Sequence, residues 1–375
     1  MLKNDILNYL VSNAGEIVTG GKIAEYLNVS RTAVWKNINS LIEEGYEIEK
    51  YQNSGYKLTS LSDKLLLESI NKNLRTSVIG KEILILDSID STNNYMKQQD
   101  TTKLDEGFAV TANEQTSGRG RFNRPFYSQK GEGIYLSFLL KPQTDIKNVP
   151  FITICAAVSV VKAIKNVTNI DVSIKWVNDI FYNKKKLCGI LTEGVISAEL
   201  GTLDYVVVGI GLNTGNIPKE VDEIATSISN IIENTSDKVL CNTNPLENTS
   251  VENDLDEFTR NINNLKSNSN SDESNSKIVD LKSTKILEEG FRNILIAEIM
   301  NQFEIHYIQF LNGDVEDIVD FYSNKLFIIN KFVTVKSGDS LLRGKVVGID
   351  KNCHLLIEED DKKIISISSG EVILN

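Results

Sequence analysis

Histidine, paired cysteines and long apolar runs are scarce in this 375-residue sequence. The two histidines, His306 and His354, are too few for a histidine-based zinc site or catalytic triad. The four cysteines form no C-x-x-C pair, which is typical of a reducing cytoplasm. The first residues of the sequence do not show the basic start and unbroken apolar stretch of a signal peptide. The apolar segment 151–161 is short and is interrupted by polar residues. We therefore expect a cytoplasmic protein with neither a secretion signal nor a membrane span.

The charge balance limits how this protein can bind nucleic acid. A formal net charge of −11 argues against bulk electrostatic attachment. Residues 1–60 carry six basic and seven acidic side chains, a net charge of −1. Any DNA contact made there must therefore be concentrated on one face.

Residues 1–61 have the pattern of a winged helix-turn-helix. Two short helical patterns flank a turn at 28–30, and Ser30 is placed to cap the second helix, with Val34 and Ile38 facing inward. A Gln-Asn-Ser-Gly turn between two β-prone runs then predicts the wing. A helical bundle with a surface hairpin is the alternative. In a helix-turn-helix the second helix enters the major groove, and the residues expected to bind DNA are Gly21, Ser30, Arg31, Thr32, Trp35, Lys36 and Asn39.

Beyond residue 61 the pattern changes to strands and helices in alternation. A connecting helix capped by Ser62 is predicted over 62–74, and two longer helices over about 150–166 and 286–311. Short apolar runs divided by turn residues over 325–375 predict a small antiparallel barrel. The predicted strands are 83–87, 107–112, 133–140, 171–177, 187–195 and 203–212.

A polar segment, residues 231–285, interrupts this order. It contains eleven asparagines and eight serines, and its six basic and ten acidic groups give a net charge of −4. Such a composition buries too little apolar surface to offset the entropy lost on ordering. We expect a disordered or partly helical insertion.

A glycine- and arginine-rich loop, Gly118-Arg119-Gly120-Arg121-Phe122-Asn123-Arg124, lies between two predicted strands. The glycines allow a close approach to an anion, and arginine forks match phosphate or carboxylate. A dinucleotide fingerprint would need a third glycine in place of Asn123 and a following helix, so it is excluded. A solvated basic loop is the alternative, but three arginines beside two glycines in an acidic chain favour an anion site.

Lys175 ends a β-prone run, where its ammonium group would lie against a ligand anion. Asn178 and Asp179 follow, and these residue types can hold a metal or a phosphate-bound water. The signal is weak by itself, because a strand that ends in Asn-Asp is usually followed by a simple turn.

Two further motifs are polar or glycine-rich. Ser91-Thr92-Asn93 begins a helix, and N-capping explains one of these residues but not all three. Gly209 and Gly211 suggest a nucleotide loop. No clear helix opens after them, so a strand followed by a turn is the better interpretation.

Together these motifs resemble the biotin–protein ligases, and the resemblance covers the whole chain except about 231–285. The stretch Ser30-Arg31-x-Ala33-Val34-x-Lys36 resembles the bifunctional ligase/repressor branch. The five motifs that occur in the family's order are Ser91-Thr92-Asn93, Gln115-x-x-Gly118-Arg119-Gly120-Arg121, Lys175-Trp176-x-Asn178-Asp179, Lys186-Leu187-x-Gly189-Ile190-Leu191-x-Glu193 and Gly209-Ile210-Gly211-Leu212-Asn213.

The resemblance implies an α+β multidomain protein. A winged helix-turn-helix would occupy 1–61, a mixed sheet with helices like that of class II aminoacyl-tRNA synthetases 62–323, and an SH3-like β-barrel 324–375. The implied enzyme makes biotinyl-5′-AMP from biotin and ATP with Mg²⁺, and transfers biotin to a lysine of a biotin carboxyl carrier protein. The implied repressor binds operator DNA as an adenylate-bound homodimer. No tightly bound prosthetic group and no membrane partner are expected.

The resemblance also implies roles for individual residues. Catalysis would fall to Lys175, Arg119 and Arg121. Biotin would contact Ser91, Thr92, Asn93, Gln115, Arg119, Gly120, Arg121 and Lys175. ATP and the adenylate would contact Arg119, Arg121, Arg124, Asn178, Asp179 and Asn213, with Mg²⁺ near Asn178 and Asp179. The sequence departs from the family at Val177, Asn123 and Phe126, where proline, glycine and tryptophan are usual. We expect these changes to alter loop dynamics rather than to abolish activity.

Three other classes of protein compete with this interpretation. A lipoate–protein ligase would carry an Arg-Arg-x-Ser-Gly-Gly-Gly-like stretch, which the sequence lacks. A non-enzymatic ligand-sensing transcription factor needs no phosphate clamp such as Lys175 with Arg119 and Arg121. A ligase with a vestigial DNA-binding domain stays open at this level.

Overall fold

The computed structural model describes residues 2–13, 16–43, 46–51, 54–60, 64–196, 203–241, 290–338 and 340–374. They fall into two compact units. The first consists of the described residues up to Lys64 together with residues 290–291, and the second of the remaining described residues from Leu65 on. Of the polar segment 231–285, residues up to 241 form the end of helix α7, Ile228–Cys241. The remainder of that segment lies outside the described residues.

The first unit is the predicted winged helix-turn-helix. The Ser30 hydroxyl accepts a hydrogen bond from the Ala33 amide at 3.1 Å, so Ser30 caps the second helix of the motif as expected. Ile48 and Leu58 of the wing belong to the same buried core as the helices, which excludes a bundle that merely carries a surface hairpin. The elements are α1 (Leu2–Ser12), α2 (Gly20–Tyr26), α3 (Arg31–Glu43), β1 (Glu47–Tyr51) and β2 (Gly55–Ser60).

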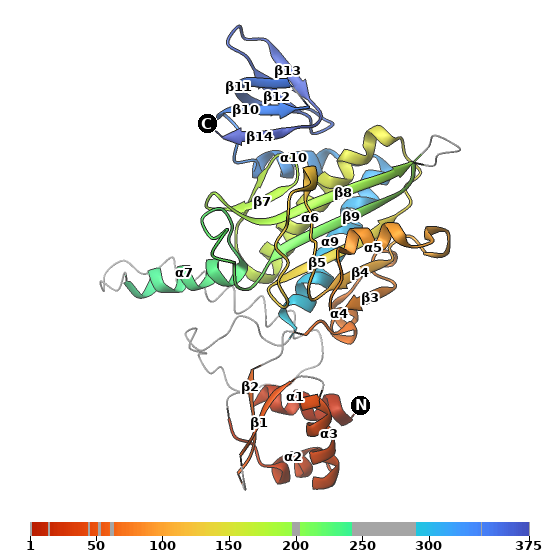
Figure 1. Ribbon diagram of the computed structural model, residues 1–375, viewed down its shortest axis with the longest axis vertical. Helices are drawn as coiled ribbons and strands as arrows, with labels where there is room; N and C mark the ends of the chain where they lie inside the picture. Colours follow the sequence, from red (N-terminus) through yellow and green to blue (C-terminus); the bar gives the residue numbers. More distant parts are fainter. Residues whose placement is uncertain are drawn as a thin grey trace. The chain divides into compact units, whose positions relative to one another are not determined.

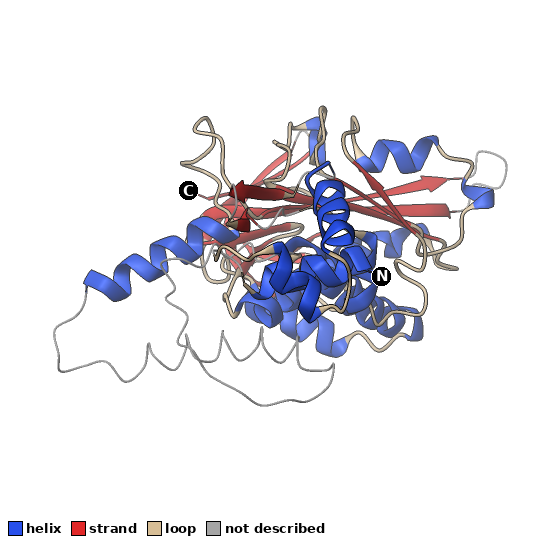
Figure 2. Ribbon diagram, turned by 90° about the horizontal axis from the view of Figure 1, so that it is seen from below, coloured by secondary structure: helices blue, strands red, loops and turns tan. Residues whose placement is uncertain are grey.

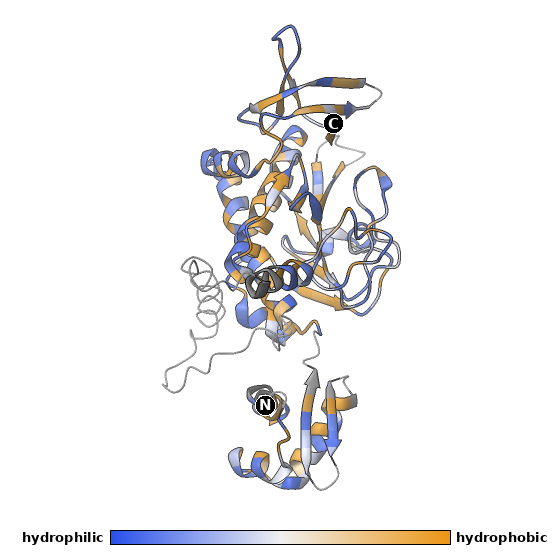
Figure 3. Ribbon diagram, turned by 90° about the vertical axis from the view of Figure 1, so that its left-hand side faces the viewer, coloured by the Kyte–Doolittle hydropathy of each residue, from blue (hydrophilic) through white to orange (hydrophobic). Residues whose placement is uncertain are grey.

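The second unit is built on a seven-stranded mixed sheet in the order β3-β4-β5-β9-β8-β7-β6 (Figure 1). Only the β3–β4 pair is parallel among its strands. Strand β7 was not predicted. Figure 3 shows that the central strands are mainly apolar. The strands are β3 (Ile83–Leu86), β4 (Ala109–Ala112), β5 (Gly133–Leu140), β6 (Ser173–Lys175), β7 (Asp179–Tyr182), β8 (Lys185–Ile196) and β9 (Leu203–Asn213).

The two faces of the sheet have different partners because side chains alternate along each strand. On β8, Glu193 bonds to α5 (Thr92–Gln98), while the adjacent Thr192 bonds to Thr153 of α6 (Val149–Thr168). Phe138 of β5 packs against Phe303 of α9 (Phe291–Asn312), which places α9 on the α6 side. Figure 2 shows the strands of the sheet nearly edge-on. The α5 face is thereby left for a site.

Residues 146–168 are long and apolar enough, by length and composition alone, to cross a membrane. This stretch is longer than the segment 151–161 considered in the sequence. Its most apolar window is 83% buried inside the protein, and α6 within it packs against β7, β8 and β9. Packing in the core accounts for its composition.

The connecting helix begins later than predicted. Helix α4 spans Leu67–Asn73, so Ser62, which lies outside the described residues, is not its cap. Leu66 occupies the N-cap position without a side-chain cap, and its amide donates to Asn293 Oδ1 at 2.9 Å. A residue of α9, 227 positions along the chain, therefore contacts the start of the helix.

The C-terminal region forms a five-stranded antiparallel sheet in the order β13-β12-β11-β10-β14, in agreement with the predicted small β-domain. Helix α10 (Glu316–Lys325), which was not predicted, precedes it. Short 3₁₀ turns occur at Thr101–Lys103, Arg121–Asn123 and Ile146–Asn148. The strands are β10 (Phe332–Ser337), β11 (Ser340–Ile349), β12 (Leu355–Glu358), β13 (Ile364–Ile367) and β14 (Glu371–Leu374).

His306 of α9 is buried against α6. The Ser159 hydroxyl donates to Cys155 O at 2.6 Å and lies 2.8 Å from His306 Nδ1, so Nδ1 carries the imidazole proton. Nε2 then faces Lys162 Nζ at 3.1 Å. Burial, followed by the charge of Lys162, lowers the pKa of His306 to about 4. Asp317 faces Lys162 and partly offsets its charge.

This histidine makes the fold sensitive to acid. We expect the free energy of unfolding to be unaffected by His306 above pH 6.5 and to fall as the pH drops from 6.5 to 4, because the unfolded chain binds the proton first. The full loss is about 3 kcal/mol. Urea unfolding at a series of pH values measures it, and His306→Gln should remove this component. Identical pH dependence in both proteins would contradict the assignment.

Candidate active site

A cavity of about 670 Å³ lies on the α5 face of the sheet. It brings together segments that are far apart in the sequence. All the residues predicted for biotin, ATP and catalysis line it: Ser91, Thr92, Asn93, Gln115, Arg119, Gly120, Arg121, Arg124, Lys175, Asn178, Asp179 and Asn213.

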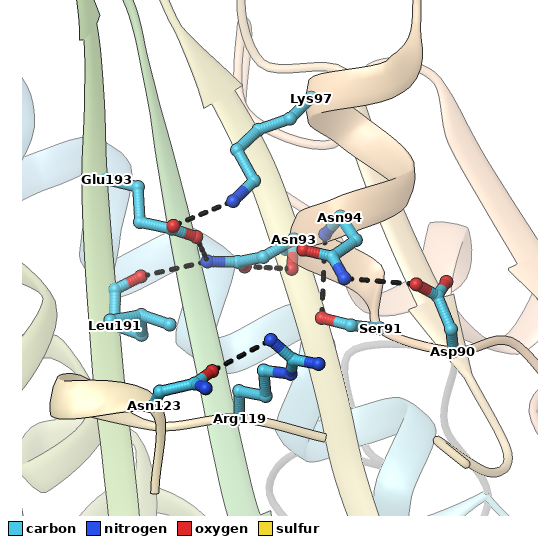
Figure 4. A network of polar contacts seen from close by, with 10 residues as sticks. Asp90, Ser91, Asn93, Asn94, Lys97, Arg119, Asn123, Leu191 and Glu193 are labelled. Atoms are coloured by element: carbon cyan, nitrogen blue, oxygen red, sulfur yellow. Dashed lines mark hydrogen bonds and ion pairs between the residues drawn. The ribbon is translucent and has the colours of Figure 1, made fainter. Parts of the chain in front are cut away.

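Asn93 is at the centre of a polar network beneath the cavity (Figure 4). Its Nδ2 donates to Glu193 Oε2 at 2.8 Å and to Leu191 O at 3.3 Å, and its Oδ1 accepts from the Ser137 hydroxyl at 2.6 Å. Glu193 also pairs with Lys97, one turn further along α5, at 2.7 Å. Both amide protons of Asn93 are therefore engaged by the protein, and the residue anchors α5 to β8.

The two glycines of β9 make room for neighbouring side chains. A Cβ atom at Gly209 would lie 2.1 Å from Asn93 Oδ1, and one at Gly211 would lie 2.5 Å from the ring of Phe126. As predicted, this stretch is a strand followed by a turn and not a nucleotide loop. The glycines are required because the strand and the cavity's side chains approach so closely.

The start of α5 is fixed by Gln115. Its Oε1 accepts from the Thr92 amide at 2.9 Å and from the Thr92 hydroxyl at 3.1 Å, while its Nε2 donates to Ser128 Oγ at 2.9 Å. Ser91 caps the helix by accepting from the Asn94 amide. Capping thus explains Ser91, and the other two polar residues of the motif are held by partners across the fold.

The arginine-rich loop is a tight hairpin. The Phe126 amide donates to Gly118 O at 2.9 Å, and the Gly120 amide donates to Arg124 O at 2.8 Å. At Gly118 a Cβ atom would lie only 2.6 Å from Phe126 O, so the close pairing requires glycine there.

Each arginine of the hairpin has a different acceptor. Arg119 Nη1 donates to Asn123 Oδ1 at 2.8 Å, and Arg121 Nη1 donates to Asn178 Oδ1 at 3.1 Å. Burial lowers the pKa of Arg121 from its ordinary value, and the charge of Asp179 opposes this effect. Since arginine is protonated at neutral pH even so, the guanidinium brings a positive charge to the cavity.

Arg124 forms a two-point ion pair with Glu371 of β14, with N–O distances of 2.5 and 2.7 Å. The hydrogen bond to Arg124 lowers the pKa of the Glu371 carboxyl. Gly370 and Val372 also line the cavity. The sequence does not predict this contribution of the C-terminal domain, because the paired residues are 247 positions apart and neither lies in a local motif that indicates the contact.

Lys175 extends from the end of β6 into the cavity lining, with its ammonium group 5.7 Å from the centre of the Phe181 ring. Burial lowers its pKa, and the charges of Asp179 and Glu371 work in the opposite direction. The next residue, Trp176, donates from Nε1 to Cys353 O at 2.9 Å. The C-terminal domain thereby fixes the strand end that carries Lys175.

Asn178 and Asp179 have protein partners. Asn178 Nδ2 donates to Ile190 O at 2.7 Å, and Asp179 Oδ1 lies 2.8 Å from Lys186 Nζ. Within the described part of the chain, no three His, Cys, Asp or Glu side chains converge as a metal cluster would require. A metal at Asp179 would have to replace or share the contact with Lys186.

The predicted DNA-binding residues lie mainly on one side of the first unit. Gly21, Arg31, Thr32 and Trp35 line a groove that also includes Lys50 of the wing. Lys36 is exposed, and Asn39 accepts a hydrogen bond from Lys50 Nζ at 2.5 Å. The Ser30 hydroxyl is engaged by the helix cap. The helix and the wing thus present cations to the same groove.

Comparisons with known proteins match each part of the chain to a described family. Residues 85–213 match the biotin/lipoate A/B protein ligase family, residues 3–57 an HTH domain, and residues 328–375 the biotin protein ligase C terminal domain. The biotin protein ligase of Aquifex aeolicus in complex with biotin and ATP superposes with a TM-score of 0.53 at 25% identity, covering 78% of this chain and 98% of that one. The fold and the cavity therefore define a protein ligase of the biotin/lipoate class.

Relatives of known function place the chain more narrowly within the biotin/lipoate class of protein ligases. The bifunctional ligase/repressor BirA of Bacillus spizizenii is 39% identical over 232 residues, 61% of this chain and 71% of the relative. BirA of Escherichia coli is 29% identical over 199 residues, 53% of this chain and 60% of the relative. The chain belongs to the bifunctional ligase/repressor family of biotin–protein ligases.

Proposed function

We propose that this protein forms biotinyl-5′-AMP from biotin and ATP, transfers biotin to a lysine of a biotin carboxyl carrier protein, and represses biotin genes when the adenylate is bound. The observation that supports this most strongly is the meeting of Lys175, Arg119 and Arg121 at one cavity whose floor is polar. In the proposal, ATP enters with Mg²⁺, and the protein works in the cytoplasm.

The reaction needs positioning and charge neutralisation more than an enzyme nucleophile. A carboxylate oxygen of biotin attacks the α-phosphorus of ATP, the bond to the β-phosphate oxygen breaks, and pyrophosphate leaves. Lys175 and Arg121 stabilise the negative charge that builds up on the α-phosphate oxygens. The acceptor lysine amine then attacks the carbonyl carbon of the mixed anhydride, AMP leaves with the bonding pair, and the amine loses a proton.

Incubation with biotin, α-labelled ATP and a purified carrier domain tests the proposal. Adenylate formation and acceptor labelling are scored separately, and lipoate replaces biotin in a parallel reaction. We expect both products with biotin only. Adenylate formation with lipoate alone would instead assign the protein to the lipoate side of its class.

Replacing Glu193 should raise the KM for biotin more than the KM for ATP. In Glu193→Ala the Asn93 amide loses its carboxylate partner. Because this leaves a buried polar group unsatisfied, the attachment of α5 to the sheet is weakened, and we expect the KM for biotin to rise about tenfold. Lys97→Met is the matched control, because it removes the half-buried ion pair but keeps the Asn93–Glu193 bond. Steady-state kinetics with each substrate varied measure both. A KM change for ATP as large as that for biotin would contradict this role.

A further inference from the structure

The tip of the arginine hairpin is formed by Phe122 and Asn123. Phe122 and Asn123 have φ angles of 55° and 58°, in the left-handed region. Asparagine is among the residues that adopt this conformation most readily, after glycine. Either glycine or asparagine therefore suits this backbone conformation. Asparagine differs in that it also supplies an amide side chain.

That side chain has a defined partner. Arg119 Nη1 donates to Asn123 Oδ1 at 2.8 Å, a contact that spans the hairpin tip (Figure 4). An arginine without such a contact samples many rotamers, and fixing it on ligand binding costs entropy. Although both side chains are exposed, the hydrogen bond from Arg119 to Asn123 restricts the guanidinium group and so lowers part of that cost.

The chemistry of the acceptor matters as much as its position. Arg119 and Arg121 donate to the amide oxygens of Asn123 and Asn178, whereas Arg124 donates to the carboxylate of Glu371. An amide orients a guanidinium group without cancelling its charge, while a carboxylate does both. Among the hydrogen bonds of the described residues, Arg124 is thus paired with a carboxylate, whereas Arg119 and Arg121 are held by neutral amides. The carboxylates of Asp90 and Asp179 act on Arg119 and Arg121 only through their charge.

We propose that Asn123 is a positioning residue, which holds Arg119 for the carboxylate of biotin through a neutral acceptor that does not compete with that carboxylate. This inference rests on the proposed function, because it takes biotin as the bound acid. It concerns the affinity for the acid and leaves the chemical step to Lys175 and Arg121.

The test uses two variants and two ligands with the full chain. Asn123→Gly keeps the left-handed backbone and removes the acceptor; Asn123→Asp keeps the backbone and the acceptor but adds a negative charge. The ligands are biotin and biotinol, in which the carboxylate is replaced by a neutral hydroxymethyl group. Titration calorimetry gives the dissociation constants, and thermal unfolding confirms that both variants fold.

We expect Asn123→Gly to weaken biotin binding roughly three- to tenfold. Asn123→Asp should weaken it further, because its carboxylate competes with that of biotin for Arg119. Binding of biotinol should be the same in all three proteins. In steady-state assays the KM for biotin should rise while kcat is unchanged.

Three results would overturn the inference: wild-type biotin affinity in Asn123→Gly, wild-type or tighter affinity in Asn123→Asp, or an equal loss for biotin and biotinol. The first would leave only a backbone role, and the third would indicate a structural defect. Failure of the wild-type chain to bind biotin at all is a different outcome, since it would contradict the proposed function itself.

Discussion

Replacing Lys175 with alanine should reduce the rate of biotinyl-adenylate formation by about 10²- to 10³-fold. The ammonium group lies in a partly buried part of the cavity lining, within reach of the charges of Asp179 and Arg124, where a positive charge acts strongly on a phosphate group. The fold should be intact, since the buried neighbours Ile174 and Trp176 fix the strand end without Lys175. Pyrophosphate release measures the rate.

Lys165→Ala is the matched control for this substitution. Lys165 is an exposed lysine near the end of α6, bonded to Asn169 O and outside the cavity lining. The two variants lose the same charge, so a difference between their rates of pyrophosphate release is due to the position of the lysine. If both variants released pyrophosphate at the wild-type rate, the assignment of Lys175 to the active site would be wrong.

Biotin with ATP should raise the affinity of the protein for its own biotin-gene upstream DNA at least about 100-fold. One domain carries a net charge of −1 over residues 1–60, so it should bind DNA poorly at physiological salt. A homodimer would place two such domains on one duplex and raise their effective concentration without new base contacts. If both helices use one side of the duplex, the half-sites should be about 34 Å apart, or a multiple of that distance.

A DNA-binding titration with and without biotin plus ATP, accompanied by sedimentation of the protein, tests this coupling. Arg31→Ala is a suitable variant, because the side chain lines the groove beside the wing and plays no part in the core. It should lower DNA affinity and leave adenylate formation unchanged. Equal DNA affinity in both ligand states, or tight binding by a monomer, would contradict the corepressor mechanism and leave the ligase assignment intact.

The sequence predicted best what local patterns determine. The cap at Ser30 and the buried Val34 and Ile38 depend on residues a few positions apart, and the structure confirms them. Strand β5 was predicted with its observed bounds because it is a mainly apolar run, interrupted by Ser137, between turn residues. The five family motifs identified the cavity lining because each motif is contiguous, whatever fold brings the motifs together.

What the sequence did not predict depends on distant contacts. Strand β7 is only four residues long and starts at Asp179, whose type suggested a turn; its pairing with β6 and β8 makes it a strand. Helix α4 starts at Leu67 and not at Ser62, with Asn293 bonded to its N-cap residue. The Arg124–Glu371 pair joins two domains, and neither residue stands out in its own segment.

The close contacts of β9 restrict how this cavity can change in evolution. A methyl group at position 209 would collide with the Asn93 amide, and one at position 211 with the Phe126 ring. Residues 209 and 93 therefore cannot vary independently, and neither can residues 211 and 126. Homologues with a residue larger than glycine at either strand position should carry a smaller partner, so that substitutions at these paired sites occur together across the family tree.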